Sequence, residues 1–218
     1  IAQCLVGSEM CIRDRYNVLP GEKAHALMAP RPKYIEGIEG VHPCPPVNSA
    51  ILALIVPFEN ELALPLIKRV NRGKYHGGQI AFPGGKMEKE DADALQTALR
   101  ECHEEIGVPE EKVSILGVLS DIYIPLSNFN ITPIVGTTLQ LPDFILSQDE
   151  VEKVILVKLR DLFDDRNKTT HSFVRHDHKI IAPGYKIGEN FIWGATAMII
   201  AELEQLMKTN TFNHLGKL

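Results

Sequence analysis

The sequence predicts an α/β fold in which a mixed β-sheet is covered on both faces by helices. Runs of strand length that are rich in β-branched residues recur between residues 48 and 159. Two segments have apolar residues at helical spacing: one lies between these runs and the other follows them. Strands that alternate with helices are typical of a sheet with a helical layer on each face. A chain of 218 residues provides a substantial core for one domain, or at most for one domain with an extra subdomain.

The strands are predicted from apolar runs bounded by turn residues. Phe58, Glu59 and Asn60 separate the first two runs, which favours a pair of strands around a turn. The predicted strands are 48–57, 61–70, 113–122, 131–138 and 151–159, with a shorter pair at 172–174 and 178–181.

The two main helices are predicted at 91–106 and 194–208. Asp91 or Asp93 provides an acid for the first turn of the earlier helix, and Gly107 is its stop signal. Its buried stripe is predicted to contain Leu95, Ala98, Leu99, Cys102 and Ile106.

The N-terminal region is predicted to lie outside the main domain. Residues 1–15, IAQCLVGSEMCIRDR, resemble a translated sequencing adapter, and we exclude them from fold reasoning. Residues 16–47 contain six prolines and one short helical segment at 22–28, which predicts an arm that wraps onto the domain. The domain itself is expected to span residues 48–210.

The composition excludes several classes of protein. A formal net charge of −5 argues against binding of nucleic acid through its phosphates. No apolar run approaches the length that spans a membrane, so no membrane partner is expected. Without residues 1–15 only Cys44 and Cys102 remain, which predicts neither a disulfide framework nor a zinc site and suits a cytoplasmic location. A homodimer and a monomer both stay open.

Three glutamates lie where an ordinary helix disfavours them. Glu101, Glu104 and Glu105 fall at i, i+3 and i+4 in the last two turns of the predicted helix. The helix dipole disfavours each negative charge there by about 1 kcal/mol or less. A divalent cation reverses the sign of this effect, and carboxylate oxygens are the ligands that Mg²⁺ or Mn²⁺ prefers. A solvated charged face is the alternative interpretation.

The surrounding segment resembles the pattern of a known family. Residues 84–108, GGKMEKEDADALQTALRECHEEIGV, are similar to the Nudix box, written G-x5-E-x7-R-E-U-x-E-E-x-G-U with U aliphatic. The match is close from Arg100 to Val108, with Cys102 at an aliphatic position. The resemblance implies an α/β/α sandwich and hydrolysis of a phosphoanhydride.

The first half of the segment departs from the general pattern. Fourteen residues separate Gly85 from Arg100, one more than the pattern has, and an Asp-rich turn at Asp91 and Asp93 replaces the early Glu. The same lengthening is usual in the coenzyme A pyrophosphatase branch of the family.

The resemblance also implies roles for individual residues. It predicts that the carbonyl of Gly85 and the carboxylates of Glu101, Glu104 and Glu105 hold Mg²⁺ or Mn²⁺. Arg100 is predicted to orient these carboxylates. In Nudix enzymes the general base is a glutamate of the box or an acid on a later loop. Glu104 and Glu150 are the candidates, with Glu104 favoured.

Residues before the box predict the substrate. His76 to Gln79 and Phe82 to Gly85 resemble an additional signature of coenzyme A pyrophosphatases, as does Arg69. The predicted substrate-binding residues are Lys68, Arg69, Arg72, Lys74, His76 and Gln79. The basic ones form a cationic cluster suited to phosphates, although an exposed strand end and loop is the alternative interpretation.

Three functions stay open from the sequence. The favoured one is metal-dependent cleavage of coenzyme A or its derivatives to 3′,5′-ADP and 4′-phosphopantetheine. The alternatives are cleavage of another nucleoside diphosphate derivative such as ADP-ribose, and an inactive Nudix domain that only binds a nucleotide. A metal site made of His171, His176 and His178 is less favoured than the glutamate site.

Overall fold

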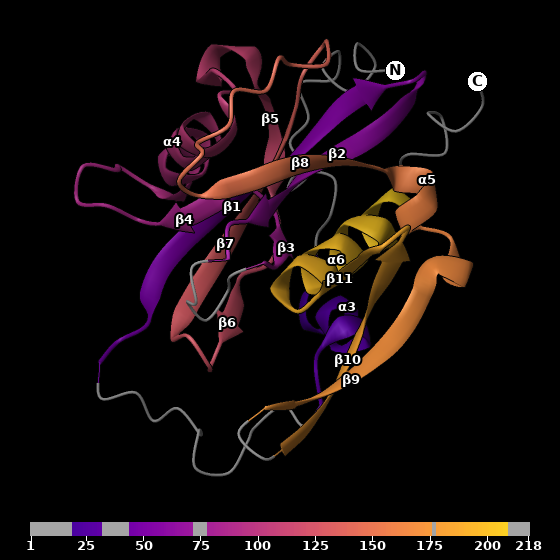
Figure 1. Cartoon of the computed structure of the whole chain (residues 1–218). Coiled ribbons are helices and arrows are strands. Elements are labelled where there is room, and N and C mark those ends of the chain that lie inside the picture. The colour runs from indigo at the N-terminus through magenta and orange to yellow at the C-terminus, as the bar shows by residue number, and fades with distance from the viewer. Residues whose placement is uncertain (1–18, 32–43, 72–77, 176–177, 209–218) are drawn as a thin grey trace.

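The fold is seen in a computed structural model that describes residues 19–31, 44–71, 78–175 and 178–208 (Figure 1). The described elements are α3 (Gly21–Met28), β1 (Val47–Phe58), β2 (Glu61–Arg69), β3 (Ile80–Ala81), β4 (Gly84–Lys86) and α4 (Ala94–Ile106). They continue with η1 (Glu110–Lys112), β5 (Ser114–Val118), β6 (Ile122–Ile124), β7 (Phe129–Thr137), β8 (Val151–Lys158) and α5 (Leu159–Leu162). The last are η2 (Asp165–Asn167), β9 (Lys168–Arg175), β10 (His178–Ile187), β11 (Asn190–Trp193) and α6 (Ala195–Lys208).

A mixed sheet forms the centre of the domain. Among the described residues it has eight strands, with the main order β3-β2-β1-β7-β5. β4 pairs with β1, β6 with β7 and β8 with β2. The β1–β7 pair is parallel, whereas β1 pairs with β2 and with β4 in antiparallel fashion. The predicted α/β class with a mixed sheet is therefore confirmed.

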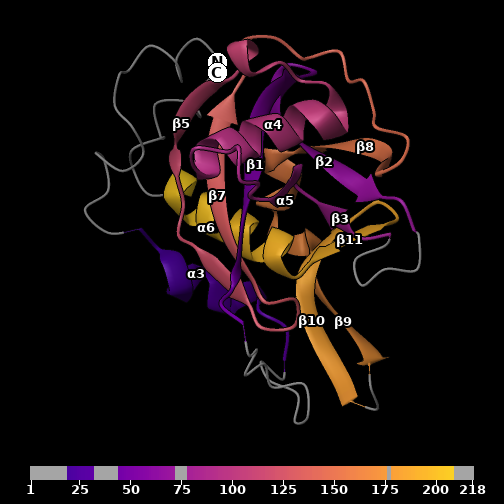
Figure 2. The same ribbon diagram turned by 90° about the vertical axis from the view of Figure 1, so that its left-hand side faces the viewer.

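The central strand β1 sends alternate side chains into two hydrophobic cores. Leu52 and Leu54 pack in one core with Cys102 and Ile106 of α4. Ala53 and Ile55 pack in the other core with the apolar face of α6. Successive side chains of a strand point to opposite faces of the sheet. The sheet is thus covered on both faces, with α4 on one side of β1 and α6 on the other (Figures 1 and 2).

The helix that carries the glutamates begins later than predicted. The prediction started it at Asp91, but α4 begins at Ala94. Asp93 is the N-cap residue, with extended backbone angles and a side chain that accepts a hydrogen bond from the Gln96 N–H. The predicted end is confirmed, because Gly107 adopts a left-handed conformation (φ 73°) that ends the helix.

Two predictions for the strands were wrong in extent. The run 113–122 forms two strands, β5 and β6, separated by residues 119–121. The short pair at 172–174 and 178–181 belongs to a separate three-stranded antiparallel sheet in the order β11-β10-β9. Most described side chains of β9 are exposed, so the strand lacks the apolar signal that predicts its length. Figure 2 shows β9 and β10 extending away from the main sheet.

The described part of the predicted N-terminal arm packs against the body of the protein. Ala24 and Met28 of α3 are buried, and α3 lies against α6 (Figure 1). Arg31 then forms an isolated antiparallel bridge with Ile181 of β10. No helix in the part of the chain that the structure describes is long and apolar enough to cross a membrane.

Candidate active site

The site is built on α4, whose apolar stripe fixes the helix to the sheet. Ala98, Cys102 and Ile106 are fully buried against β1, as the sequence predicts. The glutamates on the adjoining face differ in exposure. The side chain of Glu104 is 56% exposed and that of Glu105 is 0% exposed. Burial of Glu105 is the feature that the helical pattern missed, because it depends on a second segment that covers the helix.

That second segment is the Gly84–Gly85 pair of β4. The Gly84 N–H donates a hydrogen bond of 2.9 Å to Glu105 Oε2. A Cβ at Gly84 would lie 2.5 Å from the carbonyl oxygen of Ala50, and a Cβ at Gly85 would lie 2.3 Å from Glu101 Oε1. Position 84 therefore requires glycine, because a Cβ there would meet the backbone of β1. A side chain at Gly85 would instead push the carboxylate of Glu101 out of its present position.

Arg100 joins two of the glutamates. Its Nη1 donates to Glu101 Oε1 at 3.1 Å and to Glu104 Oε2 at 3.0 Å. Its Nη2 donates to the carbonyl oxygen of Lys86 at 3.2 Å, which ties the helix to the end of β4. One guanidinium thus lies between two carboxylates and reduces the repulsion between them.

Asp91 holds Arg100 in this position, a role that the sequence reading missed. Its carboxylate accepts hydrogen bonds of 2.9 Å from both Nε and Nη2 of Arg100. It also accepts from Thr97 Oγ1 and from the Glu88 N–H. The hydrogen bonds from Arg100 are the main reason why the pKa of Asp91 lies well below its ordinary value, although burial opposes them.

The position of Asp91 corrects the prediction that it lies in the first turn of the helix. It precedes α4 and lies six residues after Gly85, where the Nudix box pattern has its early Glu. The extra residue of this chain therefore falls between Asp91 and Arg100. The spacing of six residues from Gly85 is the sequence signal that identifies Asp91 as the counterpart of the early Glu.

Glu105 is a buried carboxylate with incomplete hydrogen bonding. Its Oε1 lies 3.3 Å from Nη1 of Arg69, and it accepts no hydrogen bond from the described residues. Burial raises the pKa of Glu105 to about 7, against the positive charge of Arg69 and the hydrogen bond from Gly84. Arg69, which the sequence predicts to bind substrate, lies beside the most buried carboxylate of α4.

Glu150 lies close enough to influence the carboxylates of α4. Burial is the main cause that raises the pKa of Glu101 and of Glu105, and the negative charge of Glu150 adds to both shifts. Glu150 is exposed and directly precedes β8, and its carbonyl oxygen accepts from the Val70 N–H. The structure thus brings both candidates for the general base, Glu104 and Glu150, to the same region.

The remaining predicted substrate residues are only partly described. The Nζ of Lys68 donates to Glu152 Oε1 at 2.7 Å, away from α4. The carbonyl oxygen of Gln79 accepts from the Arg69 N–H at 3.0 Å. Arg72, Lys74 and His76 lie outside the described residues.

The histidine alternative gains no support from the structure. His171 stacks on Phe191 with ring centroids 3.8 Å apart. His176 and the side chain of His178 lie outside what the structure describes.

The glutamates fit a hard divalent cation in chemistry, although they face arginines here. In the described ranges, no three His, Cys, Asp or Glu side chains converge closely enough to hold a metal as they stand. The Arg100 guanidinium bridges Glu101 and Glu104 instead. Two observations favour a cation: the unpartnered buried Oε1 of Glu105, and the carboxylate of Glu101 that lies against the backbone of Gly85. Such oxygen donors are those that Mg²⁺ and Mn²⁺ prefer.

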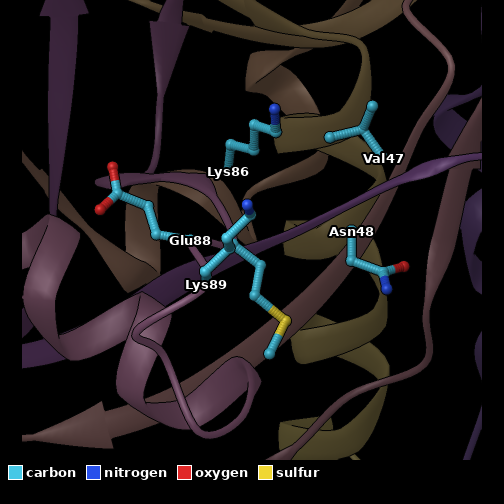
Figure 3. A pocket seen from close by; sticks show the side chains of 6 residues that line it. Val47, Asn48, Lys86, Glu88 and Lys89 are labelled. Atoms are coloured by element: carbon cyan, nitrogen blue, oxygen red, sulfur yellow. The ribbon is translucent and has the colours of Figure 1, made fainter.

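A shallow hollow lies beside this cluster, where β4 meets the start of β1. Its volume is about 320 Å³. It is lined by Val47, Asn48, Lys86, Met87, Glu88 and Lys89 (Figure 3). Lys86 and Lys89 provide two exposed cations next to the carbonyl that Arg100 contacts. Neither lysine was among the predicted site residues.

Comparison with known proteins identifies the family of the chain. The family model described as NUDIX domain matches residues 48–176. The chain is 34% identical over 161 residues to a protein of Enterobacter sp. (strain 638) named "Uncharacterized Nudix hydrolase NudL", covering 72% of this chain and 82% of that protein. It is 35% identical over 158 residues to the protein of the same name from Pectobacterium atrosepticum, covering 72% and 80%.

A solved structure described as a NUDIX hydrolase from Nitrosomonas europaea superposes with a TM-score of 0.49 at 20% sequence identity. That superposition covers 79% of this chain and 74% of the other. The family model and the two relatives decide the assignment: this chain belongs to the Nudix hydrolase family.

Proposed function

We propose that this Nudix hydrolase cleaves the diphosphate of coenzyme A or its derivatives, giving 3′,5′-ADP and 4′-phosphopantetheine. The hydrolysis of nucleoside diphosphate derivatives is the broader activity of the family. The observation that carries the proposal is the carboxylate cluster of α4 held against Gly84 and Gly85. Those glycines end the segment Phe82 to Gly85, which resembles the coenzyme A pyrophosphatase signature together with Gln79 and Arg69.

The proposed cation is Mg²⁺ or Mn²⁺, held by the Gly85 carbonyl and by Glu101, Glu104 and Glu105. When bound, such an ion neutralises the diphosphate and polarises the phosphorus that is attacked. The protein residues supply the rest. Arg100 fixes the directions of Glu101 and Glu104, since one guanidinium contacts both carboxylates.

The proton of the attacking water is proposed to go to Glu104. Its side chain is 56% exposed, so water reaches it directly. Glu150 is the second candidate, because it is also exposed and is close enough for its charge to influence Glu101 and Glu105. A cytoplasmic location belongs to the same proposal, because the free thiols of Cys44 and Cys102 suit a reducing compartment.

Product analysis tests the substrate directly. The purified protein is incubated with coenzyme A and either Mg²⁺ or Mn²⁺, and the products are separated and identified by mass. We expect 3′,5′-ADP and 4′-phosphopantetheine, and no products when EDTA is present. ADP-ribose is the matched comparison substrate. Faster cleavage of ADP-ribose would replace coenzyme A as the substrate, and metal-dependent binding without cleavage of either would indicate a binding domain.

A further inference from the structure

Arg69 lies on the face of β2 that is turned toward α4, because it shares this face with Ile67, which packs in the same core as Cys102. An irregularity of the sheet lies beside it. In the β2–β8 pair, Lys68 lies opposite Lys153, but Arg69 lies opposite Val151, so Glu152 is an extra residue on β8. An extra residue of this kind bends the strand and re-aims neighbouring side chains, and such bulges are frequent beside active sites. Lys68 points to Glu152, while Arg69 points to the buried Glu105.

The contact between Arg69 and Glu105 joins a half-exposed cation to a fully buried anion. The side chain of Arg69 is 33% exposed and that of Glu105 is 0% exposed. Nη1 of Arg69 lies 3.3 Å from Glu105 Oε1, the oxygen that accepts no hydrogen bond from the described residues. A second contact, from Nη1 to the Gly84 carbonyl, is long at 3.5 Å. Arg69 therefore neutralises Glu105 without being locked to it by a bidentate pair.

We propose that Arg69 substitutes for the metal on Glu105 and then moves to the diphosphate of the substrate. The inference rests on the proposed role of Glu105 as a metal ligand. A divalent cation on the unpartnered Oε1 of Glu105 would repel the guanidinium of Arg69. Two hydrogen bonds to Asp91 hold Arg100 in its place, whereas the side chain of Arg69 has, among the described residues, only the long contact to the Gly84 carbonyl beside Glu105. With a cation bound to Glu105, Arg69 would leave this carboxylate, and its side chain, which is already 33% exposed, would turn toward solvent and the phosphates of the substrate. Metal binding would thereby make the guanidinium of Arg69 available to the diphosphate of the substrate.

This exchange predicts effects of opposite sign on two ligands. Removal of Arg69 removes a competitor of the metal, so the metal alone should bind more tightly. It also removes a phosphate contact, so a diphosphate should bind more weakly once the metal is present. An arginine that merely positions Glu105 would have a different signature, because its loss would weaken both.

The experiment measures Mn²⁺ binding without nucleotide, by electron paramagnetic resonance, at pH about 8.5, where protons compete little for carboxylates. We expect Arg69→Gln to lower the Kd for Mn²⁺ roughly fivefold or more, within the usual range of coupling between sites. Lys153→Gln is the matched control, since it removes an exposed cation from the neighbouring strand β8. It should leave the Kd nearly unchanged. An equal or weaker Mn²⁺ affinity in Arg69→Gln would overturn the proposal.

A second measurement uses methylenediphosphonate, a diphosphate that cannot be hydrolysed, at saturating Mg²⁺. Arg69→Gln should weaken its binding roughly tenfold, as expected for a charge-assisted contact. Unchanged binding would show that Arg69 does not move to the phosphates.

Two further variants separate the possible causes of failure. Glu105→Gln should abolish tight Mn²⁺ binding. If it does not, the proposed metal site is wrong and the role of Arg69 falls with it. Arg69→Lys keeps the charge but loses the planar fork, and it serves if Arg69→Gln does not fold. It should also bind Mn²⁺ more tightly than the wild type, by a smaller factor, and a weaker affinity would contradict the exchange.

Discussion

At the scale of single residues, two glutamates of α4 should respond differently to the same substitution. Glu104 is mostly exposed and Glu105 is fully buried. Glu104→Gln should lower kcat by about 100-fold or more, in the range of general base catalysis, and should leave the melting temperature unchanged. Glu105→Gln should lower kcat by a similar factor and also alter the melting temperature, because its surroundings are closed. Steady-state kinetics and thermal melts check both, and near-normal activity in Glu105→Gln would refute its role as a ligand.

Arg100 permits a second test at the same scale. Its guanidinium contacts Asp91 through two nitrogens and also reaches Glu101 and Glu104. A lysine cannot reproduce these contacts, so Arg100→Lys should lower Mn²⁺ affinity or kcat by roughly tenfold or more. Asp91→Asn should produce a similar loss and should destabilise the fold by about 3 kcal/mol, because it leaves a partly buried Arg100 without its main partner. Unchanged metal titrations together with an unchanged kcat in Arg100→Lys would show that the residue does not orient the ligands.

At the scale of elements, a buried carboxylate joins α3 to α6. Glu202 of α6 is fully buried and accepts hydrogen bonds from His25 Nε2 at 2.8 Å and from Ser120 Oγ at 2.7 Å. It also accepts from the Gly21 N–H at 3.1 Å. Three segments that are distant in the sequence therefore meet at one side chain, which anchors the described part of the N-terminal region to the body.

The hydrogen bonds of Glu202 should make the free energy of unfolding depend on pH in a defined range. Burial raises the pKa of Glu202. The hydrogen bonds from His25, Ser120 and Gly21 and the charge of His25 lower the pKa by more than burial raises it, so it lies below the ordinary value of 4.5. A lowered pKa in the folded state stabilises the protein above pH 4.5, and this contribution is lost as the pH falls below that value. The free energy of unfolding should thus fall more steeply below pH 4.5 in the wild type than in Glu202→Gln. Glu189→Gln, an exposed control, should retain the wild-type slope.

Local pattern could predict some elements because their signals lie within one segment. The apolar stripe of α4, its end at Gly107 and the central strands follow from periodicity and from a stop residue. The full length of β9 could not be predicted because its side chains are mostly exposed. The burial of Glu105 could not be predicted because β4, from elsewhere in the chain, covers it. The contact of Arg69 with Glu105 is likewise tertiary, since it joins β2 to α4, two elements that are distant in the sequence.

At the scale of the whole molecule, the cationic groups near the site should divide between two tasks. Coenzyme A differs from simple nucleotides by its 3′-phosphate, so a selective enzyme needs a cation that reads this group. Arg72→Ala should raise KM for coenzyme A roughly tenfold and should affect dephospho-coenzyme A much less. Arg69→Ala should impair both substrates equally, because Arg69 serves the diphosphate that they share. Equal losses for Arg72→Ala on both substrates would leave the 3′-phosphate to other cations, such as Lys86 and Lys89, which line the hollow beside β4.

The strands β1 and β7 pair in parallel, and the segments that form the proposed site lie in the long stretch of sequence between them. Val47 pairs with Phe129, and both β4 and α4 lie between these two strands in the sequence. Pairs of strands that are distant in the sequence form late, since the entropy lost on closing the chain precedes the contacts that compensate for it. During synthesis on the ribosome, α4 therefore cannot be fixed on a completed sheet until the chain has grown past Thr137. A nascent chain that stops before β7 should be unable to bind metal, even though all three glutamates of α4 are already present.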